Sequence, residues 1–188
     1  MKILRLSVLF LLLGACVFGM SKESTFYTLA SQKTAVLSDK NLHFIGINRI
    51  QLPKYMDRPQ IVTQSKDSTE MVLSEYNRWI EYPSVLATRV LVEDLSSLLP
   101  QTQIKENQFG MDKFNQIVFV EVTNMSAVLG EKAELTAWYT IKNNLGIVLV
   151  RQKFMDVIQI GNTYDDMARG YSELWMNLSR HIATSLTK

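Results

Sequence analysis

Apolar residues near the C-terminal end of the chain recur at a helical period. They fall three and four residues apart, at Met167, Tyr171, Leu174, Trp175, Leu178 and Ile182. This spacing places them on one face of a helix, which predicts an amphipathic helix packed on a sheet, with Trp175 in the core. Thr163 or Asp165 can cap the start of this helix, because a side-chain oxygen there can accept from a free backbone amide.

A second helical period begins after Pro83. Ala87, Leu91, Leu95 and Leu98 share one face of the predicted helix. Ser84 is a candidate N-terminal cap, and Pro100 marks the end, since proline cannot continue the backbone hydrogen-bonding pattern. The sequence therefore predicts two main helices.

Alternating apolar residues predict two long strands and a hairpin in the second half of the chain. Residues 116–122 place three valines on one face, and residues 133–142 alternate strictly between apolar and mostly polar side chains. Asn143 and Asn144 tolerate a positive φ and Gly146 eases a turn, so residues 147–157 are expected to return as an antiparallel strand.

Shorter strands are predicted in the first half of the chain. Residues 24–29 are rich in strand-favouring side chains. Residues 42–52 carry apolar side chains at both even and odd positions, which is typical of a strand buried on both faces. Residues 61–63 and 71–73 flank the polar segment 65–70, which indicates a hairpin loop. Strands joined by hairpins and interspersed with two helices favour an α+β fold.

The expected fold is thus a single α+β domain with a mostly antiparallel sheet and two main helices packed on it, spanning residues 24–188. Hydrophobic residues make up 47% of the 188 residues and charged residues 20%. These values are close to the average of folded globular domains, so the chain has enough apolar side chains to build a core.

The first residues differ from the rest and have the layout of a secretory signal. Lys2 and Arg5 precede an apolar run from Leu6 to Leu13, and the small residues Gly14 and Ala15 follow. A helix over residues 6–20 would rise about 22 Å, whereas a bilayer core is about 30 Å thick. We therefore interpret residues 1–15 as a cleaved signal peptide and not as a membrane span.

The segment Leu13-Gly14-Ala15-Cys16 resembles the lipobox of bacterial lipoproteins, in which the cysteine is acylated and becomes the new N-terminus. Cys16 is the chain's one cysteine, which excludes an intramolecular disulfide. Several acyl chains hold a protein firmly in a bilayer. The resemblance implies a lipidation site at Cys16, with residues 16–23 as a lipidated tether.

The residue after Cys16 is Val17 and not Asp, which for lipoproteins of this kind implies transfer to the outer membrane. The expected location is the inner leaflet of that membrane, with the domain facing the periplasm. Lys2 and Arg5 account for two of the 20 basic residues, leaving 18 against 18 acidic residues. This neutral balance gives no indication of nucleic-acid binding.

The inventory of chemical motifs points away from an enzyme. The sequence contains neither a G-x-S-x-G nucleophile motif nor a phosphate-binding glycine motif, and it has two histidines, His43 and His181. The acidic pairs Glu93-Asp94 and Asp165-Asp166 cannot converge on one ligand, because adjacent helical residues point in different directions. No catalytic residue, metal ligand or cofactor is predicted.

Two features are weak candidates for an interface. Trp138 lies on the polar parity of its strand, so both exposure and coverage by another layer remain open. The turn Asp57-Arg58-Pro59 changes the chain direction rigidly, since Pro59 fixes its own φ and restricts Arg58. A structural corner is the simpler reading of this turn, and a docking surface is the alternative.

Several segments together resemble the PqiC (YmbA) family of intermembrane-transport lipoproteins, which belongs to the ABC-type transport auxiliary lipoproteins. Besides the lipobox, they are Phe26–Leu29, Leu52–Val62, Arg78–Glu81 and Thr163–Met167. The resemblance implies a non-enzymatic lipoprotein that works with a PqiB-like MCE protein, whose tunnel carries lipids between membranes. It also implies a homo-oligomeric ring that docks the far end of that tunnel. The alternatives are a lipoprotein that binds a soluble ligand or glycan and a hydrolase with an unrecognised site.

Overall fold

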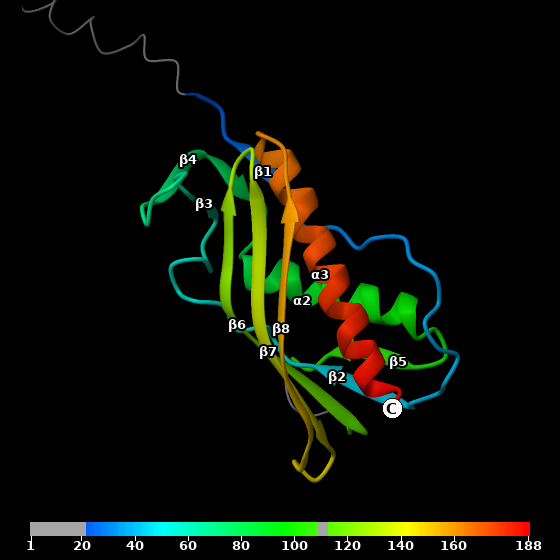
Figure 1. Ribbon diagram of the computed structural model, residues 1–188. Coiled ribbons are helices and arrows are strands. Elements are labelled where there is room, and N and C mark those ends of the chain that lie inside the picture. The colour runs from blue at the N-terminus through cyan, green and yellow to red at the C-terminus, as the bar shows by residue number, and fades with distance from the viewer. Residues whose placement is uncertain (1–21, 109–112) are drawn as a thin grey trace, which may run out of the picture.

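The computed structural model describes residues 22–108 and 113–188. The predicted signal peptide and Cys16 lie outside these residues. Two sheets and two helices form the described chain (Figure 1). The smaller sheet has the strand order β1 (Thr25–Tyr27), β4 (Met71–Trp79) and β3 (Gln60–Gln64). The larger sheet has the order β5 (Gln103–Glu106), β2 (Phe44–Ile47), β6 (Gln116–Val128), β7 (Lys132–Asn143) and β8 (Val148–Gln159).

The predicted α+β class is confirmed, and both sheets are mixed. The long strands β6, β7 and β8 pair antiparallel, as do β3 and β4. The short strands β1, β2 and β5 pair parallel with their neighbours. Antiparallel pairing therefore dominates where tight turns connect consecutive strands, and parallel pairing occurs where longer segments intervene.

The predicted hairpin between β7 and β8 is confirmed. Gly146 has a φ of 79°, and its amide donates to the carbonyl of Asn143 at 3.0 Å. By contrast, the strand predicted over residues 42–52 is much shorter. His43 has a φ of 64° directly before β2, and the chain leaves the sheet after Ile47. Backbone hydrogen bonds then hold residues 48–52 against β6, where Gln51 forms an isolated bridge with Glu121.

Thr163, one of the two predicted caps, is the N-cap of helix α3 (Tyr164–Leu186), and it forms a capping box with Asp166. The Asp166 amide donates to the Thr163 hydroxyl at 3.0 Å, and the Asp166 carboxylate accepts from the Thr163 amide at 3.1 Å. These bonds satisfy amides that otherwise lack partners at a helix start. The Thr163 hydroxyl, which also donates to the Asp166 carboxylate at 2.7 Å, and the Thr163 amide together lower the pKa of the Asp166 carboxyl.

Helix α2 (Pro83–Leu98) does not use the predicted cap. Ser84 lies inside the helix, Pro83 occupies its first turn, and Tyr82 at the N-cap position makes no side-chain capping bond. The prediction of a Ser84 cap was wrong because Pro83, whose missing amide suits the first helical position, is itself the first residue of the helix.

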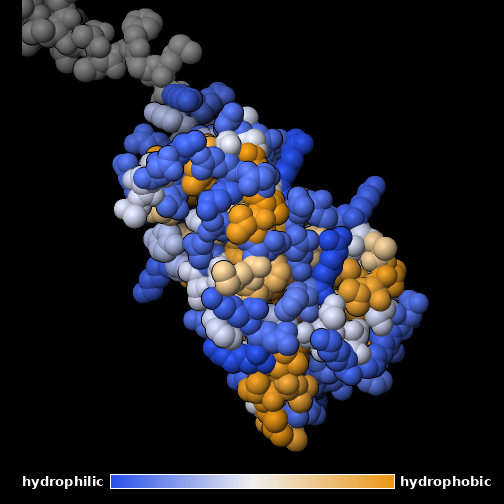
Figure 2. Space-filling view, in the orientation of Figure 1, coloured by the Kyte–Doolittle hydropathy of each residue, from blue (hydrophilic) through white to orange (hydrophobic). Residues whose placement is uncertain are grey.

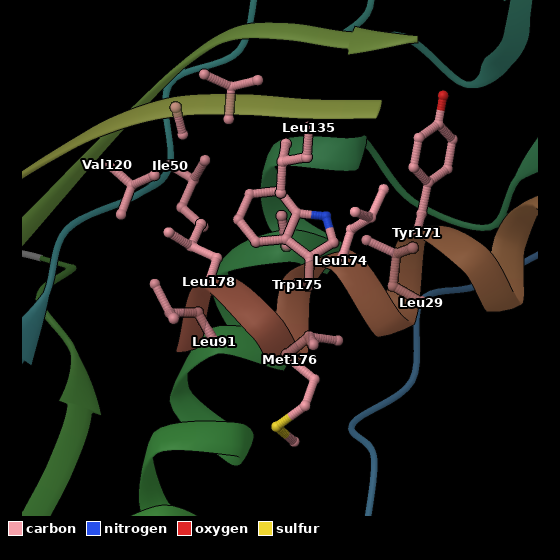
Figure 3. Packing of buried hydrophobic residues seen from close by; sticks show 14 of the residues in the cluster. Leu29, Ile50, Leu91, Val120, Leu135, Tyr171, Leu174, Trp175, Met176 and Leu178 are labelled. Atoms are coloured by element: carbon pink, nitrogen blue, oxygen red, sulfur yellow. The ribbon is translucent and has the colours of Figure 1, made fainter. Parts of the chain in front are cut away.

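Both helices pack on one face of the five-stranded sheet and bury the apolar side chains of β6 and β7 (Figures 1 and 3). Trp175 is fully buried, which confirms the sequence prediction; Leu174 and Leu178 of α3, Leu91 of α2 and Leu135 of β7 pack around it (Figure 3). Within the described ranges, no helix has the length and apolarity needed to cross a bilayer.

Candidate functional site

The face of the five-stranded sheet that points away from the helices carries the most distinctive surface of the described chain. Phe119 and Glu121 of β6 lie beside Trp138 and Thr140 of β7, and Arg151 of β8 pairs with Thr140. Successive side chains of a strand point to opposite faces of the sheet. Because Tyr139 and Ile141 are buried on the face that the helices cover, these residues point to the other face.

A hollow of about 290 Å³ opens on this face. The strands supply its floor, and the segment after β2 supplies one wall. The lining residues are Asn48, Arg49, Gln51, Phe119, Val120, Glu121, Trp138, Thr140, Lys142, Val148 and Arg151. The predicted interface residue Trp138 therefore lines a hollow and is half-buried.

Two cation–ring contacts define the chemistry of the hollow. The guanidinium of Arg151 lies 5.2 Å from the centre of the Trp138 ring, and the ammonium of Lys142 lies 4.9 Å from the centre of the Phe119 ring. Such contacts hold a long basic side chain in place while leaving its hydrogen-bonding groups accessible. The hollow is thus lined by positioned cations on an aromatic floor.

The charge balance of the hollow is positive. Its lining contains three cations, Arg49, Lys142 and Arg151, and one carboxylate, Glu121. Arg49 is 3.5 Å from the carboxylate of Glu106. Neither Lys142 nor Arg151 forms an ion pair with a carboxylate among the described residues. Two cations therefore remain available for an anionic group from outside the domain.

The turn of the β7–β8 hairpin, next to the hollow, exposes apolar side chains. Leu145 is 78% exposed, Ile147 57%, Val148 52% and Leu149 51%. We call these four residues the apolar tip. Figure 2 shows a hydrophobic patch at the lower end of the molecule, where Figure 1 places the β7–β8 turn. Val148 belongs both to the tip and to the lining of the hollow, so the two form one continuous surface.

The other predicted interface residues, Asp57, Arg58 and Pro59, form the corner before β3. The Asp57 carboxylate accepts from the amide of Ser84 at 3.0 Å, and the Pro59 carbonyl accepts from the amide of Trp79 at 2.7 Å. None of the three corner residues lines the hollow around Trp138. The corner therefore has a structural role, joining β3 and β4 to the start of α2.

The two histidines lie apart from each other. His181 of α3 has its Nδ1 atom 3.0 Å from the Tyr139 hydroxyl, which also contacts Gln152 at 2.5 Å and Ser185 at 2.8 Å. Burial raises the pKa of Tyr139. His43 is exposed before β2. In residues 22–108 and 113–188, no three His, Cys, Asp or Glu residues are placed to hold a metal ion.

Most residues of the hollow have no distinctive pattern in the sequence. Asn48 and Gln51 were assigned to a strand, and Lys142 and Arg151 have no distinguishing sequence context. The alternation along β7 did point to Trp138, because this aromatic residue stands at a position where the other side chains are polar. The apolar tip gave no signal, since exposed and buried strand residues look alike in one sequence.

Comparison with known proteins identifies the family of this chain. The family model of the ABC-type transport auxiliary lipoprotein component matches residues 27–183. The chain therefore belongs to this family, which confirms the family resemblance noted in the sequence. No curated protein matches the chain.

Two solved structures share the fold. One, described as an uncharacterized protein, is 19% identical with a TM-score of 0.72, and the match covers 88% of this chain and 99% of that one. The other is protein XCC0632 of the DUF330 family from Xanthomonas campestris, 10% identical with a TM-score of 0.70, and the match covers 85% and 93% of the two chains. At these identities the similarity establishes the fold.

Proposed function

We propose that this chain is a non-enzymatic outer-membrane lipoprotein of a PqiABC-like MCE intermembrane lipid transport system. It is anchored through acylated Cys16 in the inner leaflet of the outer membrane and faces the periplasm. There it docks the periplasmic tunnel protein, a PqiB-like MCE protein, as part of a homo-oligomeric ring.

Membership of the auxiliary lipoprotein family is the observation that carries this proposal. An auxiliary component acts by binding other components, so an exposed surface without internal partners is the feature it requires. The continuous surface of apolar tip and cationic hollow meets that requirement. The lipobox at residues 13–16 supplies the anchor, and the absence of Asp after Cys16 supports the outer membrane as its location.

The proposal is tested by isolating the affinity-tagged chain from detergent-solubilised envelopes. The expected result is co-isolation of an MCE-type protein. Cys16→Ala is the matched control, because it should leave an uncut or soluble chain with a folded domain and without the partner. Repeated isolation of the acylated chain without any MCE-type protein would contradict the proposal.

A lipoprotein that binds a soluble ligand or glycan is the second candidate. The observation in its favour is the hollow itself, where Trp138 offers a ring face and Asn48 and Gln51 offer side-chain amides. Its volume of about 290 Å³ lies just below the range of roughly 300–1,000 Å³ typical of ligand pockets. A glycan array on which the chain binds a sugar and Trp138→Ala abolishes that binding would favour this candidate.

A further inference from the structure

The apolar tip is not explained by the stability of the domain. Leu145, Ile147 and Leu149 are more than half exposed, and the sheet core ends at the buried Ile141. A turn that only connected two strands would be polar, because exposed leucine and isoleucine gain nothing from the fold. Four exposed aliphatic side chains within residues 145–149, at the end of the hairpin, are therefore expected to be covered by something outside the domain.

The surface beside the tip indicates the charge of whatever covers it. Val148 connects the tip to the hollow, where Lys142 and Arg151 rest on aromatic rings and have no carboxylate partner within the described chain. A segment that fits both the tip and the hollow is therefore apolar where it meets the tip and carries carboxylates where it meets Lys142 and Arg151. Opposite charges arranged in this way favour correct encounter and register of two proteins.

The position of the tip distinguishes a protein from the bilayer as its occupant. The described chain begins at Lys22, and strand β1 lies at the opposite end of the molecule from the β7–β8 turn (Figure 1). Five residues separate Cys16 from Lys22, a stretch that spans at most about 20 Å. With the acyl chains in the membrane, this tether holds the end containing β1 near the bilayer, and the apolar tip lies at the end of the domain opposite the anchor.

We propose that the apolar tip and the cationic hollow together dock an acidic, apolar segment of the periplasmic partner protein. This inference rests on the proposed function and specifies the surface through which it operates. Leu145 and Ile147 insert into an apolar groove of the partner, and Lys142 and Arg151 bind carboxylates at its rim. Trp138 and Phe119 hold the two cations in position.

The test measures binding of the periplasmic region of the MCE-type protein from the same organism to the acylated mature chain. The chain is anchored in nanodiscs of phosphatidylethanolamine and phosphatidylglycerol. Leu145→Ser with Ile147→Ser removes the apolar anchors, and Lys142→Glu with Arg151→Glu reverses the two cations. Each pair should weaken binding about tenfold or more. Added salt should weaken wild-type binding but not that of the charge-reversed pair.

Two matched control pairs are available in the same chain. Met71→Ser with Leu73→Ser removes apolar side chains of β4 that are 40% and 44% exposed. Lys33→Glu with Lys54→Glu reverses two exposed lysines outside the hollow. Both control pairs should bind within about twofold of wild type. Unfolding midpoints of all variants verify that each chain is folded before binding is compared.

The outcomes separate this inference from the proposed function. If wild type binds and both tip and hollow pairs bind equally well, the surface is wrong while the proposed function stands. If wild type itself does not bind, the proposed function fails and the docking surface with it.

A polarity-sensitive fluorophore on Leu149→Cys distinguishes the other occupants. Its emission should shift to the blue when the partner is added. A blue shift on nanodiscs alone would mean that lipid covers the tip. A shift that grows with chain concentration without partner would mean that a second copy does. Either result would overturn the inference.

Discussion

The carboxylate of Asp57 accepts a hydrogen bond from the backbone amide of Ser84 at 3.0 Å, across 27 positions of the sequence. Ser84 lies in the first turn of α2, where backbone amides have no partner inside the helix. Because Tyr82 at the N-cap makes no side-chain bond, Asp57 supplies the capping oxygen from a distance. The corner before β3 thereby fixes where α2 begins.

Replacing Asp57 by alanine should therefore destabilise the domain. Loss of a helix-capping oxygen costs about 0.5–2 kcal/mol of unfolding free energy. Asp57→Asn should retain most of the stability, since an amide oxygen can accept the same bond. Urea unfolding of the two variants measures the difference, and equal stability of Asp57→Ala and wild type would show that the contact does not cap the helix.

The buried Asp94 should make stability depend on pH. Its carboxylate accepts from the hydroxyls of Ser31 at 2.6 Å and Ser179 at 3.1 Å. Desolvation by burial nevertheless raises the pKa of Asp94 above its ordinary value of 3.8, because it outweighs these bonds. The folded chain thus binds this proton more tightly than the unfolded chain. Stability should fall as pH rises from about 3.8 through the raised pKa and then level off.

Asp94→Asn should lack this part of the pH dependence. The neighbouring Glu93 is exposed, so Glu93→Gln serves as the control that keeps it. Unfolding free energies between about pH 4 and 8 test the prediction. It fails if wild type and Asp94→Asn show the same slope over that range.

The capping box of α3 should be needed for full stability. Thr163→Ala removes the hydroxyl that accepts from the Asp166 amide and should cost about 1 kcal/mol. Thr184→Ala changes the same residue type at an exposed site within the helix, and it should be neutral or slightly stabilising because alanine favours helices. Thermal unfolding compares the two variants; an equal effect would argue against a special role for Thr163.

Trp175 and Trp138 should respond very differently to truncation. Trp175 is fully buried among α2, α3 and β7, so Trp175→Ala should cost about 3–5 kcal/mol. Trp138 is half-buried at the hollow, so its replacement by alanine should cost much less. Denaturant midpoints measure both. A comparable loss for Trp138→Ala would show that its ring supports the fold rather than an interface.

The helices illustrate what one sequence can and cannot predict. The regular spacing along α3 identifies its buried face residue by residue, because local geometry alone sets which side chains share a face. The start of α2 was predicted incorrectly, since its cap comes from Asp57 in another part of the chain. Local patterns do not contain such long-range partners.

The sheets follow the same rule. The β7–β8 hairpin was predictable because Asn143 and Gly146 encode a tight turn. The parallel pairing of β2 between β5 and β6 was not, since it depends on segments that meet only after the chain has folded. For the same reason Trp138 could be nominated while its partner Arg151 could not.

A folded, lipid-anchored domain that presents a docking surface from the outer membrane requires an acylated Cys16. Mass spectrometry of the native mature N-terminus, combined with separation of inner and outer membranes, measures both the anchor and its location. We expect a chain that begins at Cys16, carries acyl groups on that residue and is found in the outer-membrane fraction. A mature protein that starts at another residue without lipid, or is recovered in the inner membrane, would contradict this expectation.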